Sequence, residues 1–389
     1  MFRVVLSLFL SLSLLSGCGN SRELNQYAIV LGTAIDLTED GEIELSVQFL
    51  NPEAGGNISG GGGSGGGGNG SFSIVRTGKG LTVSDAASKL QELIPRKLFW
   101  GHCKVFVFGE GLVKEGISDV LDYIVRAPYT REQAKLFVSK GDAKQILYVQ
   151  PPMEKVSSRV IRLLSELNIL MSITVIDFVQ MMISVSNDSY LPYVDILPPN
   201  SASESGQETV PFITGTAVLK HGKLVGVLDD RLTRGIMWMK NDIKDSQVVV
   251  KNPLGKGSIT LSPFQATTHL VPIIKNGQWK IIVKSRAKGE IIENETNIDL
   301  MNPQIVRIVE KQIENDISKR IQKSFNKLQK DMNADIVDIA ETFERKYTNE
   351  FKKVKDHWDE KFKNIQLEID VDAHITGPGL FTIPANHYK

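Results

Sequence analysis

The sequence predicts an α+β protein of three domains, in which helices pack on mixed or antiparallel sheets. Two observations predict the sheets. Stretches of alternating apolar and polar residues recur along the chain, and two-residue turn signals such as Asp40-Gly41 and His221-Gly222 lie between some of them. A third observation predicts a long amphipathic helix in the C-terminal domain, because apolar residues recur every third or fourth position from Ile305 to Met332.

The first 17 residues have the pattern of a signal peptide. Arg3 supplies one positive charge, and Val4 to Leu15 is apolar apart from three serines. This run of about 12 residues is shorter than the roughly 20 that a membrane-spanning helix needs, and it suits the apolar core of a signal peptide. Residues 1–17 are therefore left out of the predicted fold.

The residues at the predicted cleavage point resemble a bacterial lipobox. In Leu15-Ser16-Gly17-Cys18 the cysteine thiol would take a diacylglyceryl group, and this chemistry requires cysteine because a thiolate is a strong nucleophile. We predict Cys18 as the first residue of the mature chain and as the site of S-diacylglycerol attachment, with its amino group open to a further acyl chain such as palmitate. Two acyl chains would anchor the chain stably to a membrane. The alternative is a plain secretory signal with an incidental cysteine.

The composition disfavours a nucleic-acid partner. Lys and Arg together number 45, and Asp and Glu also number 45, so the chain lacks the basic excess that nucleic acid requires. The two cysteines are Cys18 and Cys103. Because lipid would occupy Cys18, Cys103 has no intrachain partner, and we interpret it as a small core residue rather than a reactive thiol.

Residues 18–130 are predicted to form an N-terminal α+β domain. A glycine-rich insert at residues 55–70 interrupts it, and this composition is typical of a flexible coil. A phosphate-binding loop is disfavoured there, because no helix and no Gly-Lys-Ser/Thr motif follows. The predicted strands are 28–36, 42–50, 72–75 and 104–108, and the predicted helices are 85–94, capped by Thr82 or Ser84, and 116–125.

Residues 131–200 are predicted to form a middle domain. It has a strand at 135–139, a helix from 142 to about 149, a largely helical stretch at 156–184, and an extended segment at 191–197. The serine-rich segment that follows Pro198-Pro199 is typical of a linker, which we place at residues 201–208.

Residues 209–389 are predicted to form a C-terminal α+β domain. A hairpin at 214–228 precedes a helix that Asp229 or Asp230 caps and that ends near Met239. The further predicted strands are 248–251, 257–262, 267–274, 279–287 and 362–375.

The long helix begins at Pro303. Beyond Met332 two interpretations are open: the helix extends through Ile336, Ala340, Phe343 and Tyr347, or it breaks near Asn333. We expect its stripe to pack on a sheet built from strands between residues 214 and 287, with a free coiled coil as the alternative. The residues expected to face that sheet are Ile313, Ile317 and Ile321.

The sequence contains no pattern that indicates an active site. No two of the six histidines have the spacing of metal ligands on one helix or hairpin, and no Gly-x-Ser-x-Gly elbow occurs. We therefore predict no catalytic residues, no cofactor site and no metal site, and we expect the chain not to be an enzyme.

Several segments, taken in order, resemble the Ger(x)C family of spore germination lipoproteins, the C subunits of nutrient germinant receptors. Each motif alone is weakly specific, but together they span nearly the whole mature chain. The segments that carry the resemblance are Leu15 to Cys18, Arg22 to Asp36, Gly101 to Glu110, Arg126 to Arg131, and Gly215 to Gly226. Two departures are visible: many members have Trp-Asp where this chain has Asn20-Ser21, and the insert at 55–70 is peculiar to this chain.

The resemblance implies a non-enzymatic subunit of a receptor complex in the spore inner membrane, required for nutrient-triggered germination. Its partners would be two integral membrane subunits, A and B. The small-molecule germinant would be sensed by the complex, and the resemblance does not assign the sensing to this chain. The chain would be lipid-anchored to the outer face of that membrane. A solute-binding lipoprotein of a transporter is the alternative, disfavoured because such proteins usually have two similar lobes with parallel sheets. An extracytoplasmic hydrolase has no motif to support it.

Overall fold

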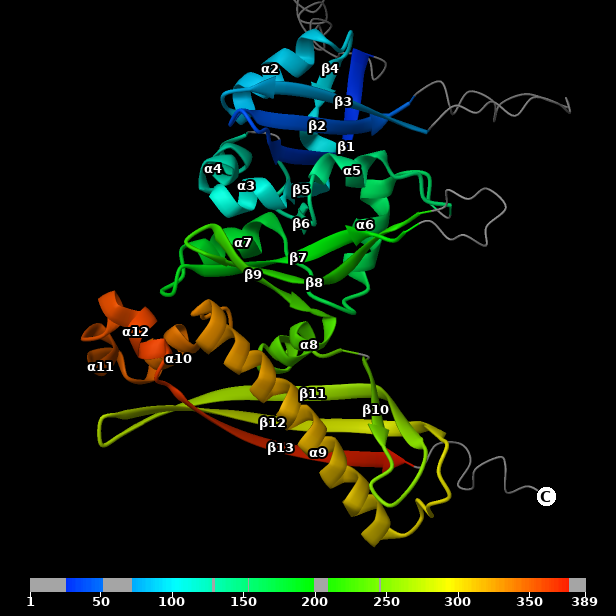
Figure 1. Ribbon diagram of the computed structural model, residues 1–389, viewed down its shortest axis with the longest axis vertical. Helices are drawn as coiled ribbons and strands as arrows, with labels where there is room; N and C mark the ends of the chain where they lie inside the picture. Colours follow the sequence, from blue (N-terminus) through cyan, green and yellow to red (C-terminus); the bar gives the residue numbers. More distant parts are fainter. Residues whose placement is uncertain are drawn as a thin grey trace, which may run out of the picture.

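The computed structural model describes residues 26–51, 72–127, 130–152, 154–198, 209–244 and 246–377. These residues form an elongated α+β body with two sheets, stacked along its long axis (Figure 1). The α+β class and the mixed sheets are as predicted. The signal peptide, Cys18, the glycine-rich insert and the 201–208 linker lie outside the described residues.

The larger sheet holds nine strands in the described part of the chain, in the order β3-β2-β1-β5-β6-β7-β8-β9, with β4 paired to β1. The four central strands β1, β5, β6 and β7 run parallel, and antiparallel pairs flank them on both sides. The bounds are β1 Tyr27–Leu37, β2 Ile43–Leu50, β3 Ser73–Gly80, β4 Lys97–Phe99, β5 Val105–Gly109, β6 Lys135–Ser139, β7 Asp188–Ile196, β8 Pro211–Lys220 and β9 Lys223–Asp229.

Helices cover both faces of this sheet because its central strands are apolar on both sides. In β5, Phe106 and Phe108 join one core cluster, whereas Val105 and Val107 join the other. Residues of α5 (Ala143–Tyr148) and α6 (Ser157–Glu166) belong to the second cluster. The helices that contribute to the first cluster include α2 Val83–Glu92, α3 Glu110–Glu115, α4 Ser118–Arg126 and α7 Val175–Met182.

One continuous sheet runs through both positions at which the sequence predicted boundaries. Strand β5 pairs with β6 across the 130/131 position, and β7 pairs with β8 across the 201–208 segment. The hairpin β8–β9, which the sequence placed in the C-terminal domain, therefore belongs to the large sheet. The division into three domains remains a prediction.

The smaller sheet has the strand order β10-β11-β12-β13, with β13 at one edge. The strands are β10 Ser246–Lys251, β11 Ser258–Lys275, β12 Gln278–Asn294 and β13 Gln366–Gly377. Strand β11 is a single element where the sequence predicted two. A register shift between Leu261 and Gln265 absorbs the interruption without ending the strand.

The long helix α9 (Pro303–Asn326) crosses the face of the smaller sheet (Figure 1). Asn302 caps it, and the π-helical turn η4 (Lys327–Met332) continues it to Asn333, which has a left-handed φ of 49°. Ile313, Ile317 and Ile321 are buried, as predicted. The predicted partner sheet was wrong in part, because residues 214–228 pair within the other sheet. Helix α9 packs on β10, which lies in the predicted range, and also on β13 and α8 (Asp230–Met239).

The sequence missed several short helices, of which η3 Trp100–His102 and α3 lie beside the larger sheet. In the C-terminal body the missed helices are α11 Thr348–Lys352, η5 Lys355–His357 and α12 Trp358–Phe362, and α10 Ile339–Lys346 is a separate helix rather than an extension of α9. Because α12 extends to Phe362, the last strand begins at Gln366 rather than at Phe362. Aromatic side chains hold this group together, among them Trp279, Phe343 and Trp358.

Candidate functional site

The residue predicted to carry lipid, Cys18, lies outside the described residues. Cys103 is fully buried, with its Sγ 3.3 Å from Thr33 Oγ1, and burial raises the pKa of its thiol to about 11. This environment suits the predicted core role. Among the described residues, no group of three His, Cys, Asp or Glu side chains is arranged to hold a metal ion.

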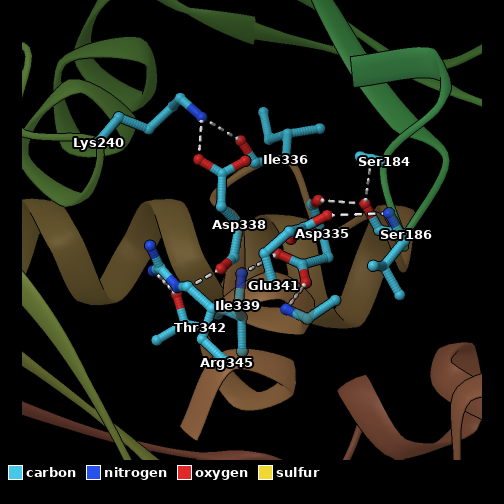
Figure 2. Close-up of polar contacts among 12 residues, drawn as sticks. Ser184, Ser186, Lys240, Asp335, Ile336, Asp338, Ile339, Glu341, Thr342 and Arg345 are labelled. Carbon is cyan, nitrogen blue, oxygen red and sulfur yellow. Dashed lines mark hydrogen bonds and ion pairs between the residues drawn. The ribbon is translucent and has the colours of Figure 1, made fainter. Parts of the chain in front are cut away.

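Buried charged residues gather instead at the junction between the two sheets. The start of β7 meets the segment that joins η4 to α10 there (Figure 2). Asn187, Asn333 and Asp338 adopt left-handed φ values of 52°, 49° and 60°. Asn and Asp tolerate this region better than other non-glycine residues, so they allow the tight turns that bring the two segments together.

Asp335 is the most highly connected of these residues. Its Oδ1 accepts the Ile339 N–H at 3.1 Å, and its Oδ2 accepts the Ala340 N–H at 2.8 Å and Trp358 Nε1–H at 3.2 Å. Its own carbonyl accepts from Ser186 Oγ at 3.2 Å (Figure 2). Asp335 therefore joins the first turn of α10 to α12 and to the approach of β7. Burial raises the pKa of its carboxyl to about 7.

Asp188 is a second buried carboxyl, at the first position of β7. Its Oδ2 accepts the Asp335 N–H at 2.7 Å, whereas its Oδ1 is buried without a hydrogen-bond partner among the described residues. Burial raises the pKa of Asp188 to about 7, against the opposing influence of Lys220. The Lys220 ammonium itself donates to the Asn333 carbonyl and to Asp359 Oδ1, each at 2.6 Å.

Lys240, just after α8, provides the other cation of the junction. Its Nζ donates to Asp338 Oδ2 at 2.7 Å and to the Ile336 carbonyl at 3.3 Å (Figure 2), and lies 5.3 Å from the centre of the Tyr190 ring. Burial alone would lower the pKa of Lys240, but Tyr190 and the Asp338 carboxylate together hold it above its usual value. Lys240 is therefore a fixed positive charge.

Glu341 faces this cluster from α10. Its Oε1 accepts the Val185 N–H at 3.0 Å, and its Oε2 is buried without a partner in the described part of the chain. A polar atom buried in this way costs free energy unless a water molecule or a ligand satisfies it.

A cavity of about 450 Å³, which we call the junction cavity, opens beside these residues. Residues from both bodies line it, and the polar ones that matter below are Asp177, Gln180, Tyr190, Lys240, Asp338 and Glu341. Charged groups of both signs and apolar side chains meet in it, a combination that ligand pockets also have. An open groove of about 1,100 Å³ lies on the smaller sheet, and a pocket of about 190 Å³ lies in the larger sheet's core.

Sequence reasoning identified none of the junction residues. Asp188, Asp335 and Glu341 are spread over more than 150 positions, and single acidic residues are usually solvated. The one local signal was the pattern near Asn333, which left a break or a longer helix open; the helix ends there, and the junction segment begins.

No helix in the described ranges combines the length and apolar character needed to cross a bilayer.

The chain is similar to known proteins over almost its whole length. Residues 20–196 match the family described as spore germination protein N-terminal domain, and residues 214–379 match the family described as spore germination B3/GerAC like, C-terminal. Spore germination protein KC of Bacillus subtilis (strain 168) is 27% identical over 396 residues, which cover 98% of this chain and 96% of that protein. Spore germination protein B3 of the same organism is 24% identical, covering 96% of each chain.

A solved structure shares the fold. The crystal structure of the GerBC protein matches with a TM-score of 0.57 at 20% identity, covering 89% of this chain and 97% of that one.

Proposed function

The chain belongs to the Ger(x)C family of spore germination proteins, and on this premise we propose that it is the non-enzymatic lipoprotein C subunit of a nutrient germinant receptor. The observation that carries the proposal is the order of the amino-terminal segments. The match to the first family domain begins at residue 20, directly after the lipobox that ends at Cys18. The transporter-type solute-binding alternative has no comparable support, because the similar fold is that of GerBC.

The lipid anchor would fix the orientation of the molecule. Only residues 19–26 separate Cys18 from Tyr27 at the start of β1, and a fully extended chain of this length reaches at most about 30 Å. The end of the large sheet that holds the start of β1 and β4 would therefore lie next to the outer face of the spore inner membrane. The smaller sheet lies at the opposite end of the body (Figure 1).

The partners in this proposal are two integral membrane subunits, A and B. Purification of the full-length protein from spore membranes should recover both, and recovery of neither would contradict the receptor assignment. The relatives are named spore germination proteins, which supports a role in germination but does not identify the germinant.

Replacement of Cys18 by alanine tests the anchor. In spores whose only copy carries Cys18→Ala, we expect no fatty-acid label on the protein, because the alanine side chain has no thiol to acylate. We also expect the protein to leave the membrane fraction and the response to nutrients to fall. The matched control is Cys103→Ala, which changes the other cysteine and should keep the label. Label retained by Cys18→Ala would refute the anchor, and an undiminished nutrient response would refute the need for it.

A further inference from the structure

The junction cavity has the size of a small-molecule site. Its volume of about 450 Å³ lies within the roughly 300–1,000 Å³ typical of ligand pockets, and such pockets occur preferentially where two bodies meet. One wall comes from α7 and β7 and includes Asp177 and Tyr190. The other comes from the end of α8 and from α10 and includes Lys240 and Glu341.

The charge of the lining favours a cation. Four carboxyl groups, those of Asp177, Asp242, Asp338 and Glu341, face a single ammonium group, that of Lys240. Lys240 is bonded to Asp338 at 2.7 Å, so it offers little to an incoming anion, and Lys244 lies 3.4 Å from Asp242. Asp177 and Glu341 form no ion pair with a described residue, and their negative charge would attract a positively charged ligand.

Two polar groups at the cavity are left without protein partners. The Tyr190 side chain is only 6% exposed, and its hydroxyl makes no hydrogen bond to any described residue. Glu341 uses Oε1 to accept the Val185 N–H, but its Oε2 finds no partner in the same set of residues. Buried polar atoms are normally hydrogen-bonded, so Glu341 Oε2 indicates that a further hydrogen-bond donor belongs here, whereas the Tyr190 hydroxyl is open to the cavity and free to contact it.

The rest of the lining indicates an organic ligand rather than a bare metal ion. Met171, Ile173 and Met181 contribute apolar surface beside the Tyr190 ring, and thioethers pack well against aromatic or aliphatic groups. The described carboxylates do not form a group of three that could hold a metal. Aromatic faces also attract organic ammonium groups, as the position of Lys240 over Tyr190 illustrates.

We propose that the junction cavity binds a small organic ammonium compound. The Glu341 carboxylate accepts a hydrogen bond from the ligand's ammonium group, the Tyr190 hydroxyl makes a second polar contact, and the thioethers of Met171 and Met181 pack on the ligand's apolar part. The site lies on this chain alone, and it requires neither the lipid anchor nor the membrane subunits.

Benzylammonium is a suitable probe, because it joins one ammonium group to an aromatic ring. We would add it to the full-length protein labelled with ¹³C at the methionine methyl groups and follow those resonances by NMR. The methyls of Met171 and Met181 should shift saturably, with a Kd on the order of 1 mM for so small a ligand. The exposed Met301, outside the cavity lining, should not shift.

Two variants and one control test the recognition. Glu341→Gln keeps the shape but removes the charge, and it should weaken binding by about tenfold or more because a charge-assisted hydrogen bond is lost. Tyr190→Phe should weaken it by a smaller factor. The control is Glu344→Gln, which changes the net charge equally on the same helix but outside the cavity lining, and it should leave the Kd unchanged.

Three outcomes would overturn the proposal. The first is an absence of saturable shifts at Met171 and Met181 up to about 10 mM benzylammonium, ten times the expected Kd. The second is equally tight binding of benzyl alcohol, which has the same ring without the charge, or of Ca²⁺ alone. The third is an equal loss of binding in the Glu341→Gln and Glu344→Gln variants. None of these outcomes bears on the Cys18 test, so failure here is distinguishable from failure of the receptor assignment.

Discussion

Buried aspartates in this protein stabilise the starts of helices, either from a distant strand or from the segment just before the helix. Asp36 on β1 accepts the Ala143 and Lys144 N–H groups at the start of α5, at 2.6 and 2.9 Å, while the adjacent Asp142 makes no side-chain cap. Asp335 does the same for the first turn of α10. Each carboxyl satisfies backbone donors that a helix start leaves free, and the helix dipole favours its charge. Burial opposes that charge.

Because burial opposes the negative charge of these carboxyl groups, we predict that the free energy of unfolding falls as the pH rises. Burial raises the pKa of Asp36 to about 6 and those of Asp188 and Asp335 to about 7, from 3.8 for an ordinary aspartate. Below about pH 4 these groups are protonated in both states. Between about pH 4 and pH 7 the unfolded chain ionises first, so the folded state binds more protons and the free energy of unfolding decreases with pH. Urea unfolding of the full-length protein at pH 5, 6, 7 and 8 would measure this.

Asp335→Asn isolates one contributor, because the amide cannot ionise. We expect the free energy of unfolding to depend less steeply on pH in this variant, whatever its absolute stability. Asp372→Asn, at an exposed position of β13, is the control and should keep the slope of the unaltered protein. A slope unchanged by Asp335→Asn, or a stability that rises from pH 5 to pH 7, would show that Asp335 is ionised in the folded state throughout.

Single residues were predictable from the sequence only where a short motif surrounds them. Cys18 has such a motif in the four residues that end with it. Asp188 and Asp335 have none, because what makes them unusual is a contact between positions 147 residues apart. Burial of a carboxyl is decided by the tertiary structure, and no local pattern in the chain records it.

Helices and turns that are set by residues next to them in the sequence were predicted well. Thr82 and Asp229 cap the helices expected after them, and His221-Gly222 forms the expected turn with φ values of 50° and 77°. The strand order was not predictable, because the pairing of β1 with β5 and of β12 with β13 joins distant segments. The sheet on which α9 packs depends on that order, which explains the partial error there.

The packing of α8 on α9 depends on one small residue. A Cβ added to Gly235 would lie 2.0 Å from Ser324 Oγ and 2.7 Å from the Arg320 carbonyl, so only glycine allows the two helices to approach this closely. Ser324 Oγ in turn donates to the Leu232 carbonyl at 2.8 Å. Helix α9 is therefore held from two sides, by the sheet and by α8.

The apolar stripe of α9 gives a prediction at this scale. Ile317→Ala should lower the free energy of unfolding by about 2–5 kcal/mol, because a side chain only 1% exposed leaves a cavity when truncated. Lys319→Ala, two residues away on the exposed side, should change it by no more than about 0.5 kcal/mol. Urea unfolding of the full-length variants would compare them. Equally mild effects would mean that the stripe does not pack on this body in solution.

At the scale of the whole molecule, the two sheets are connected by more than the chain itself. Strand β7 pairs with β8 from Asp188↔Lys220 to Ile196↔Pro211. The Asp188 side chain bonds to the segment before α10, and the Lys220 side chain bonds to that segment and to α12. Breaking the β7–β8 pair would therefore also disturb the junction. The strands on either side of residues 201–208 therefore belong to one sheet.

The last prediction follows from this coupling and concerns fragments that end at the predicted linker. Residues 18–200 and 209–389, produced separately, should each lack a cooperative unfolding transition. The first fragment would expose the edge of β7, and the second would carry β8 and β9 without the strand they pair with. Mixed or co-expressed, the fragments should associate and regain the near-ultraviolet circular dichroism of the intact protein.

The control is the intact protein cut once within 201–208 after folding, which should keep its structure because the β7–β8 pairing and the Asp188–Asp335 contact are already formed. If residues 209–389 alone unfolded as sharply and at the same urea concentration as the full chain, the boundary predicted from the sequence would be a true domain boundary. In that case the shared sheet would contribute little to the stability of either part.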